Sequence, residues 1–220
     1  MPSDAFVLGF DTSAAHCAAA LLCGDRLVSL RHEEMAKGQA ERLLPLLEQV
    51  LTDAGTDWGH LSAIGVGVGP GNFTGLRISV SAARGLALGL RIPAVAVSSL
   101  EALAFGAGRP ALASMDARRG QVYVQRFEAN LGTEAGPLLV DAESVPLQFQ
   151  TPGLAVIGAH ANAIASRLDA TAAHPIHPAA EAIARLAHAR YQTASERPAP
   201  LYVRPADAAP PREVAPGMIP

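Results

Sequence analysis

Lysine is almost absent from this 220-residue sequence, whose basic residues are sixteen arginines and the single Lys37. Twenty acidic residues leave a formal net charge of −3. Because the positive and negative charges nearly balance, the chain as a whole has no general electrostatic attraction for nucleic acid. A nucleic-acid role would therefore require a local basic patch or a partner protein.

Cysteine is also scarce, with only Cys17 and Cys23 in the whole chain. Both fall in one apolar segment that we expect to be a strand, which would separate them by about 20 Å. A disulfide between them is excluded, since bridged Cα atoms must lie within about 7 Å of each other. We expect both to be inert core residues rather than nucleophiles.

Long apolar runs are missing from the chain. No run approaches the roughly 20 residues that a membrane-spanning helix needs. The first residues, MPSDAFVLGFD, contain no basic segment followed by a long apolar one, so no secretory signal is expected. These absences predict a soluble cytoplasmic protein.

Several catalytic motifs are absent as well. The sequence contains no GxxxxGK[ST] phosphate loop, no GxGxxG fingerprint, no HExxH zinc motif and no GxSxG nucleophile elbow. Of seven histidines only His174 and His177 are closely spaced, in a proline-flanked loop without a cysteine. We therefore expect solvent-exposed loop histidines and no metal site.

What the sequence does contain is an α/β pattern that runs through its first half. An apolar repeat with helical spacing covers residues 39–51, and Pro45 inside it predicts a kink at Leu44 or a helix start near Leu43. A second helix is expected over residues 75–90. Strands are expected over residues 6–10, 17–23, 26–31, 64–68 and 94–97.

The second half echoes the first. An apolar run ends at Asp116 and is followed by a polar turn and a strand over residues 121–127, and the same order occurs at Asp11, 105 residues earlier. A strand over 154–158 and helices over 161–168 and 179–191 complete this half. We predict a first lobe over residues 1–105, a second over 106–196, and a proline-rich tail over 197–220 that is disordered or docks elsewhere.

Two polar segments of the first lobe are weak candidates for a nucleotide site. The loop from Gly69 to Gly75 could hold an anion on its backbone amides, with Asn72 or Thr74 as helix cap, or could simply be a tight turn. The turn Asp11-Thr12-Ser13 would suit magnesium and phosphate, but these residue types favour the alternative, a capped β-turn. The candidate residues are Asp11, Thr12, Ser13, Gly71, Asn72 and Thr74.

The helix over residues 75–90 carries small residues at every fourth position. Together, Ser81, Gly85 and Gly89 form a groove of small side chains that lets another helix approach closely. Ala82 widens this groove. A glycine inside a helix costs about 1 kcal/mol relative to alanine, so a compensating contact is expected. That contact is either the first helix of the same lobe or a partner protein. Arg77, Arg84 and Arg91 form a neighbouring stripe that we interpret as solvated.

Four ordered motifs resemble the bacterial TsaB family, also called YeaZ. They are LGFDTSAAHCAAALL, GVGPGNFTGLRISVSAARGLALGLRIPAVAVSSLEAL, MDARRGQVYVQRF and APLYVR. The resemblance implies a two-lobed α/β fold of the actin, hexokinase and Hsp70 class (ASKHA), with a mixed sheet and flanking helices in each lobe. Gln39 stands where many members have histidine, and Asn72 stands where they have serine.

The resemblance also implies a non-catalytic subunit for synthesis of threonylcarbamoyladenosine (t6A) in tRNA. Its partner would be a TsaD-like threonylcarbamoyltransferase, joined in the complex by a TsaE-like ATPase, with tRNA contacted only indirectly. No cofactor is expected for the isolated chain, and the sequence leaves open both a homodimer of the chain alone and a nucleotide in the complex. The expected interface residues are Leu43, Leu47, Ser81, Ala82, Gly85 and Gly89.

The alternative is a small ASKHA-type phosphotransferase or ATPase that uses Asp11 and the loop from Gly69 to Gly75. A third interpretation, an endopeptidase, has no nucleophile and base signature in the sequence to support it.

Overall fold

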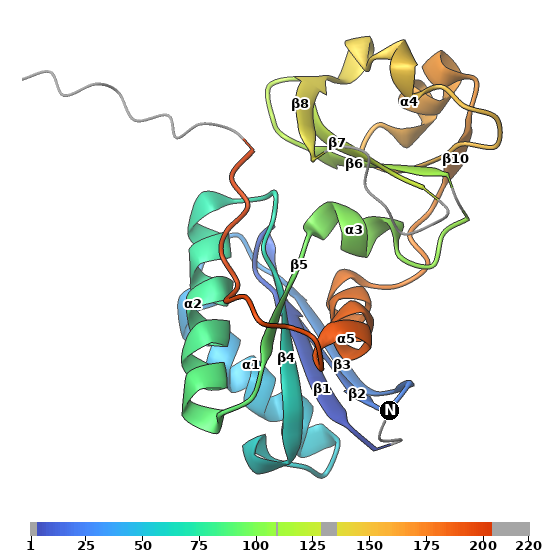
Figure 1. Ribbon diagram of the computed structural model, residues 1–220. Coiled ribbons are helices and arrows are strands. Elements are labelled where there is room, and N and C mark those ends of the chain that lie inside the picture. The colour runs from blue at the N-terminus through green and yellow to red at the C-terminus, as the bar shows by residue number, and fades with distance from the viewer. Residues whose placement is uncertain (1–3, 109, 129–135, 204–220) are drawn as a thin grey trace, which may run out of the picture.

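The computed structural model describes residues 4–108, 110–128 and 136–203, and consists of two lobes, each built on a five-stranded mixed sheet (Figure 1). In the first lobe, a tight turn with Gly24 at φ 58° joins β2 to β3, and β4 and β5 run parallel to β1. The strand order is β3-β2-β1-β4-β5. The strands are β1 (Phe6–Asp11), β2 (His16–Cys23), β3 (Arg26–Glu34), β4 (Leu61–Gly67) and β5 (Ala94–Val97).

The second lobe repeats this arrangement. An antiparallel pair, β6 and β7, is again joined by a parallel strand, β9, in the order β10-β9-β6-β7-β8. The helix α4 (Ala161–Leu168) packs on β9 and β10. The strands are β6 (Ala111–Asp116), β7 (Gln121–Phe127), β8 (Leu138–Asp141), β9 (Ala155–Gly158) and β10 (Thr171–Ala173). This duplicated topology confirms the predicted fold class, the two-lobed actin, hexokinase and Hsp70 type.

Helices α1 (Gln39–Asp53) and α2 (Phe73–Leu90) pack on one side of the first sheet. The expectation that α1 starts near Leu43 is wrong, because the helix begins at Gln39 and contains Pro45. Proline removes one backbone hydrogen bond, but the apolar stripe of α1 buries five side chains in the first core, and this packing keeps the helix continuous.

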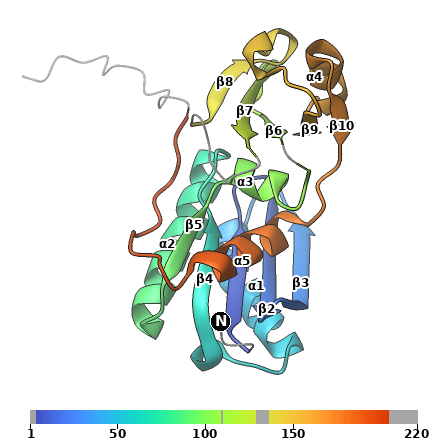
Figure 2. The same cartoon turned by 45° about the vertical axis from the view of Figure 1, so that its right-hand side comes forward.

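The other face of the first sheet is covered by α5 (Ala179–Arg190), which lies across β1 and β4 (Figure 2). Two strand glycines permit this close approach. A Cβ on Gly9 would come within 2.5 Å of the Ala184 nitrogen, and one on Gly65 within 2.7 Å of the Ala187 Cβ. The predicted boundary of the second lobe, residues 106–196, includes α5, yet the chain crosses back and packs this helix on the first sheet.

Between the lobes, α3 (Ser99–Ala104) packs against β6, β7 and β9, and Arg190 of α5 forms a bidentate ion pair with Glu101 of α3. The sequence pattern missed α3, β8 and β10, which are 6, 4 and 3 residues long and too short to show a clear period. The described residues also include three short 3₁₀ turns: Trp58–His60, Ala142–Ser144 and Leu147–Phe149. Among the described residues, no helix combines the length and the hydrophobicity needed to span a membrane.

Candidate functional site

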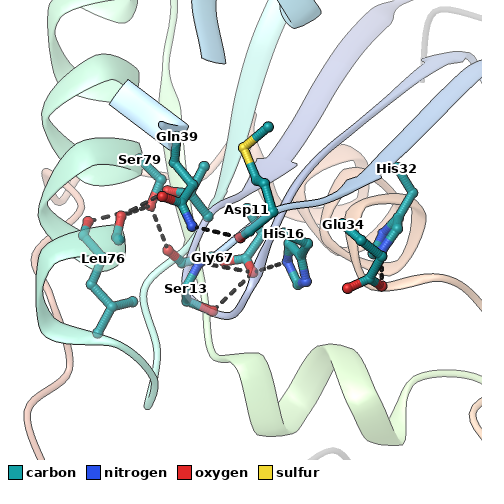
Figure 3. Close-up of polar contacts among 12 residues, drawn as sticks. Asp11, Ser13, His16, His32, Glu34, Gln39, Gly67, Leu76 and Ser79 are labelled. Carbon is teal, nitrogen blue, oxygen red and sulfur yellow. Dashed lines mark hydrogen bonds and ion pairs between the residues drawn. The ribbon is translucent and has the colours of Figure 1, made fainter. Parts of the chain in front are cut away.

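The carboxylate of Asp11 lies at the end of β1, buried to 3% exposure, in a small polar cluster (Figure 3). Its Oδ2 atom accepts hydrogen bonds from the Ser13 hydroxyl at 2.8 Å and the Ser13 backbone amide at 3.2 Å. His16 Nε2 lies 2.8 Å from the same oxygen. The other oxygen, Oδ1, lies against Gly67, where a Cβ would overlap it. The hydrogen bonds of the Asp11 carboxylate therefore stabilise the turn after β1.

The glycine loop that follows β4 packs directly on this turn. The Thr12 hydroxyl donates to the Gly75 carbonyl at 2.7 Å, and the Asn72 amide donates to the Ser13 carbonyl at 2.6 Å. A Cβ on Gly75 would overlap the Thr12 carbonyl oxygen, and one on Gly71 would come within 2.6 Å of the Ser13 carbonyl oxygen. The glycines are thus needed for contact between two stretches of backbone.

The start of α2 is capped by the protein itself. The Asn72 side-chain oxygen accepts hydrogen bonds from the Thr74 amide at 3.0 Å and the Gly75 amide at 3.1 Å. An anion cradle would need such amides to be directed at the ligand. The observed contacts fit the tight-turn interpretation of the loop better than the phosphate-cradle interpretation.

The hydrogen bonds of Asp11 also bear on the peptidase interpretation. In a serine hydrolase the hydroxyl donates to a histidine, which in turn donates to a carboxylate. Here the Ser13 hydroxyl and His16 both contact the same oxygen of Asp11. The carboxylate occupies the central position, so His16 is not placed to take the proton of Ser13.

The charge state of His16 follows from its surroundings. Burial lowers the pKa of His16, but the hydrogen bond to Asp11 and the negative charges of Asp11 and Glu34 raise it, and the net result is a pKa above the ordinary value. The His32 ring lies 5.0 Å from the His16 ring, centroid to centroid, and contacts Glu34. An ion pair between His16 and Asp11 is thereby favoured.

Cys17, beside this cluster, is fully buried and free. Burial, reinforced by the charge of Glu33, raises the pKa of its thiol to about 11. Because the thiolate is the reactive form, this cysteine is a core residue, as predicted, and not a nucleophile.

A cavity of about 280 Å³ lies beside the Asp11 cluster, with walls from both lobes. Most of its lining is apolar, including Leu103 of α3, Met115 of β6 and Ile183 of α5. His177 also lines it, where its Nδ1 atom lies 3.0 Å from Glu181 and its ring packs on Phe105. The prediction of exposure thus holds for His174 but is wrong for His177, which is half-buried. Within the described ranges, no three His, Cys, Asp or Glu side chains are grouped to bind a metal.

The small-residue groove of α2 faces away from the lobe. Ser81, Gly85 and Gly89 are exposed, and a Cβ on either glycine would meet nothing within 4 Å. Leu88, on the same part of the helix, is 78% exposed. Ala82 is half-buried against the first core. The first helix of the lobe therefore does not fill the groove at these glycines.

Two of the expected interface residues lie elsewhere. Leu43 and Leu47 are 1% and 0% exposed and belong to the first core, because they form the inward stripe of α1. They cannot contact a partner while the lobe is folded. Leu44, next to them on the helix, is 49% exposed, and periodicity alone could not separate this edge of the apolar stripe from its centre.

Sequence comparison relates the chain to proteins of tRNA modification. The family model for TsaD, the tRNA N6-adenosine threonylcarbamoyltransferase, matches residues 32–162. The tRNA threonylcarbamoyladenosine biosynthesis protein TsaB of Escherichia coli (strain K12) is 38% identical over 127 residues, 56% of this chain and 54% of that protein. The chain thus matches about half the length of its named curated relatives.

Two further comparisons cover nearly the whole chain. An uncharacterized protein of Mycobacterium tuberculosis (strain ATCC 25618 / H37Rv) is 34% identical over 209 residues, 93% of this chain and 94% of that protein. The solved structure of YeaZ from Pseudomonas aeruginosa superposes with a TM-score of 0.72 at 27% identity, covering 90% of this chain and 99% of the other. Together with the duplicated fold and the glycine-loop motif, these matches show that the chain belongs to the TsaB (YeaZ) family, which is related to TsaD.

Proposed function

We propose that this chain is a non-catalytic scaffold and activator subunit for t6A synthesis in tRNA, and that it binds a TsaD-like threonylcarbamoyltransferase through the outward face of α2. Membership of the TsaB family supports the pathway. The observation that carries the binding role is the exposed groove of Ser81, Gly85 and Gly89.

No contact within the described part of the lobe offsets the loss of helix stability that the two glycines of the groove cause. Two glycines in a helix cost about 1 kcal/mol each relative to alanine, and neither position lies close to another part of the described chain. An exposed leucine such as Leu88 gains about 1.5–3 kcal/mol when it is fully buried. A partner helix lying in the groove would bury Leu88 and approach the α2 backbone closely. The same face would serve a homodimer when the partner is absent.

The remaining contacts that we propose for the complex are those that the family resemblance implies. A TsaE-like ATPase would join through the complex, and tRNA would be bound mainly by the partner. A nucleotide, if present, would bind only in the assembled complex and not to the isolated chain.

The Asp11 cluster supports a non-catalytic role. The Oδ2 atom of Asp11 is contacted by Ser13 and His16, and the glycine loop packs on the turn that follows β1. Gln39, which stands where many relatives have histidine, donates from Nε2 to the Met35 carbonyl at 3.0 Å. It helps to hold the start of α1. These contacts disfavour the phosphotransferase alternative.

Replacing Gly85 by leucine tests the proposal. Leucine is a better helix former than glycine, so Gly85→Leu should fold at least as stably as wild type. It would fill the groove, and we expect no complex with a TsaD homologue in size-exclusion chromatography with light scattering. Gly136→Leu is the matched control, because Gly136 also has open space around it but lies in the second lobe. A folded Gly85→Leu protein that still forms the complex would disprove this interface.

A further inference from the structure

Residues 201–203 contact both lobes beside the crossing from β5 to α3, where the Ser99 amide donates to the Gly69 carbonyl at 2.8 Å. After α5 the chain passes β5, reaches α2 and then turns toward the second lobe, as both ribbon views show. Leu201 packs against the core of the first lobe, whereas Val203 packs against the cluster of β6, β7 and α3. We refer to residues 201–203 as the strap.

The strap is held to the first lobe by polar as well as apolar contacts. The Leu201 amide donates to the Val68 carbonyl at 2.7 Å, directly after β4. The Leu201 carbonyl lies close to Gly69, where a Cβ would come within 3.3 Å of it. The strap therefore pairs with the backbone at the point where the glycine loop begins.

Tyr202 extends these contacts to the first turn of α2. Its ring lies 5.2 Å from that of Phe73, centroid to centroid, and its hydroxyl is 3.1 Å from Arg77 Nε. The Arg77 guanidinium lies 3.8 Å above the Phe73 ring. Aromatic pairs and cation–π contacts of this kind are individually weak but directional. They orient the strap along α2.

We propose that the strap couples the two lobes, by fixing the glycine loop and the start of α2 on one side and the β6–β7 cluster on the other. A short segment that pairs with the backbone of one lobe and packs on the core of the other resists their relative movement. The walls of the inter-lobe cavity come from both lobes, so relative movement of the lobes would change the shape of that cavity. Release of either end is expected to loosen the other.

Amide hydrogen exchange on the full chain tests this coupling. Val203→Ala removes only the anchor on the second lobe, yet it should speed exchange at Leu201 by about tenfold, because exchange there requires local opening of the strap. Leu201→Ala should speed exchange in the glycine loop by a similar factor. The matched control is Leu147→Ala, an exposed leucine of the second lobe that should leave both rates within about twofold of wild type.

The double variant Leu201→Ala/Val203→Ala gives the decisive result. If the two anchors act through one strap, the amide of residue 201 and those of the glycine loop should exchange no more than about twofold faster in the double variant than in the faster single variant. The reason is that the effects of coupled sites are not additive. Tyr202→Phe retains the ring contact and should stay close to wild type. Unchanged exchange at Leu201 in Val203→Ala, or multiplicative effects in the double variant, would overturn the coupling.

Discussion

The hairpins β1–β2 and β6–β7 begin with the same pattern, a buried strand that ends in aspartate, yet the two aspartates have different surroundings. Asp11 is 3% exposed and is contacted by Ser13 and His16. Asp116 is exposed, and its side chain accepts a hydrogen bond from the Arg118 amide at 2.9 Å. The first hairpin is closed by another part of the chain, whereas the second presents its turn to solvent.

The cause of the difference is the segment that follows the parallel strand of each lobe. After β4, the glycine loop reaches the turn itself, with the Asn72 amide donating to the Ser13 carbonyl at 2.6 Å. After β9, the Ala159 amide donates to the Ser114 carbonyl at 2.8 Å, two residues before the aspartate. The loop of the second lobe therefore stops short of the turn, and only the first turn needs glycines opposite it.

The largest effect should come from placing a methyl group between the turn and the glycine loop. The added Cβ in Gly75→Ala would overlap the Thr12 carbonyl, a backbone atom that cannot rotate away. We expect a loss of about 3 kcal/mol in the free energy of unfolding, measured by urea denaturation. Gly85→Ala in the same helix is the control and should gain about 1 kcal/mol, because its surroundings are open. Equal effects at the two glycines would contradict the backbone contact.

Removal of the two aspartates compares the hairpins directly. Asp11→Ala leaves the Ser13 donors and His16 without their buried acceptor, and we expect a cost of about 2 kcal/mol or more in the free energy of unfolding. Asp116→Ala removes one exposed contact and should cost about 0.5–1 kcal/mol. If both variants lose the same stability, the closed turn is not held by its carboxylate.

The raised pKa of His16 should make the closed hairpin sensitive to pH. A histidine with a higher pKa in the folded state contributes stability that is fully present below its unfolded value of about 6.5 and is lost as the pH rises through the folded value. The free energy of unfolding should therefore fall as the pH rises from about 6.5 through the folded-state pKa of His16. His16→Gln should reduce this slope, and an unchanged slope would show that other groups cause it.

The smallest expected effect is that of a nucleotide on the isolated chain. If the closed turn leaves no place for phosphates, ATP with magnesium at about 1 mM should not raise the melting temperature measurably, since only ligands that bind the folded state stabilise it. A clear rise that disappears in Asp11→Asn would restore the phosphotransferase alternative.

Much of the fold could be predicted from the sequence because its signals are local. The apolar strands that end at Asp11 and Asp116 and the helical spacing of α1 and α2 each depend on a few neighbouring residues. The predicted start of the helical pattern at Gln39 is confirmed, whereas the alternative start near Leu43 is wrong, because the rule for Pro45 considers one lost hydrogen bond and not the buried stripe that holds the helix. The sequence singled out the residues of the turn after β1 and of the glycine loop as candidates. It did not predict that the glycine loop packs on that turn.

The sequence by itself determined the order of the longer elements, the small-residue groove of α2 and the family resemblance, since all three depend on residue type and spacing. Only the tertiary structure decided that α5 returns to the first sheet, that Leu44 faces outward while Leu43 faces inward, and that Thr12 bonds to Gly75, 63 residues away. Contacts between distant segments depend on how all the elements pack together. A glycine that admits another backbone has the same sequence signature as a glycine that merely turns the chain.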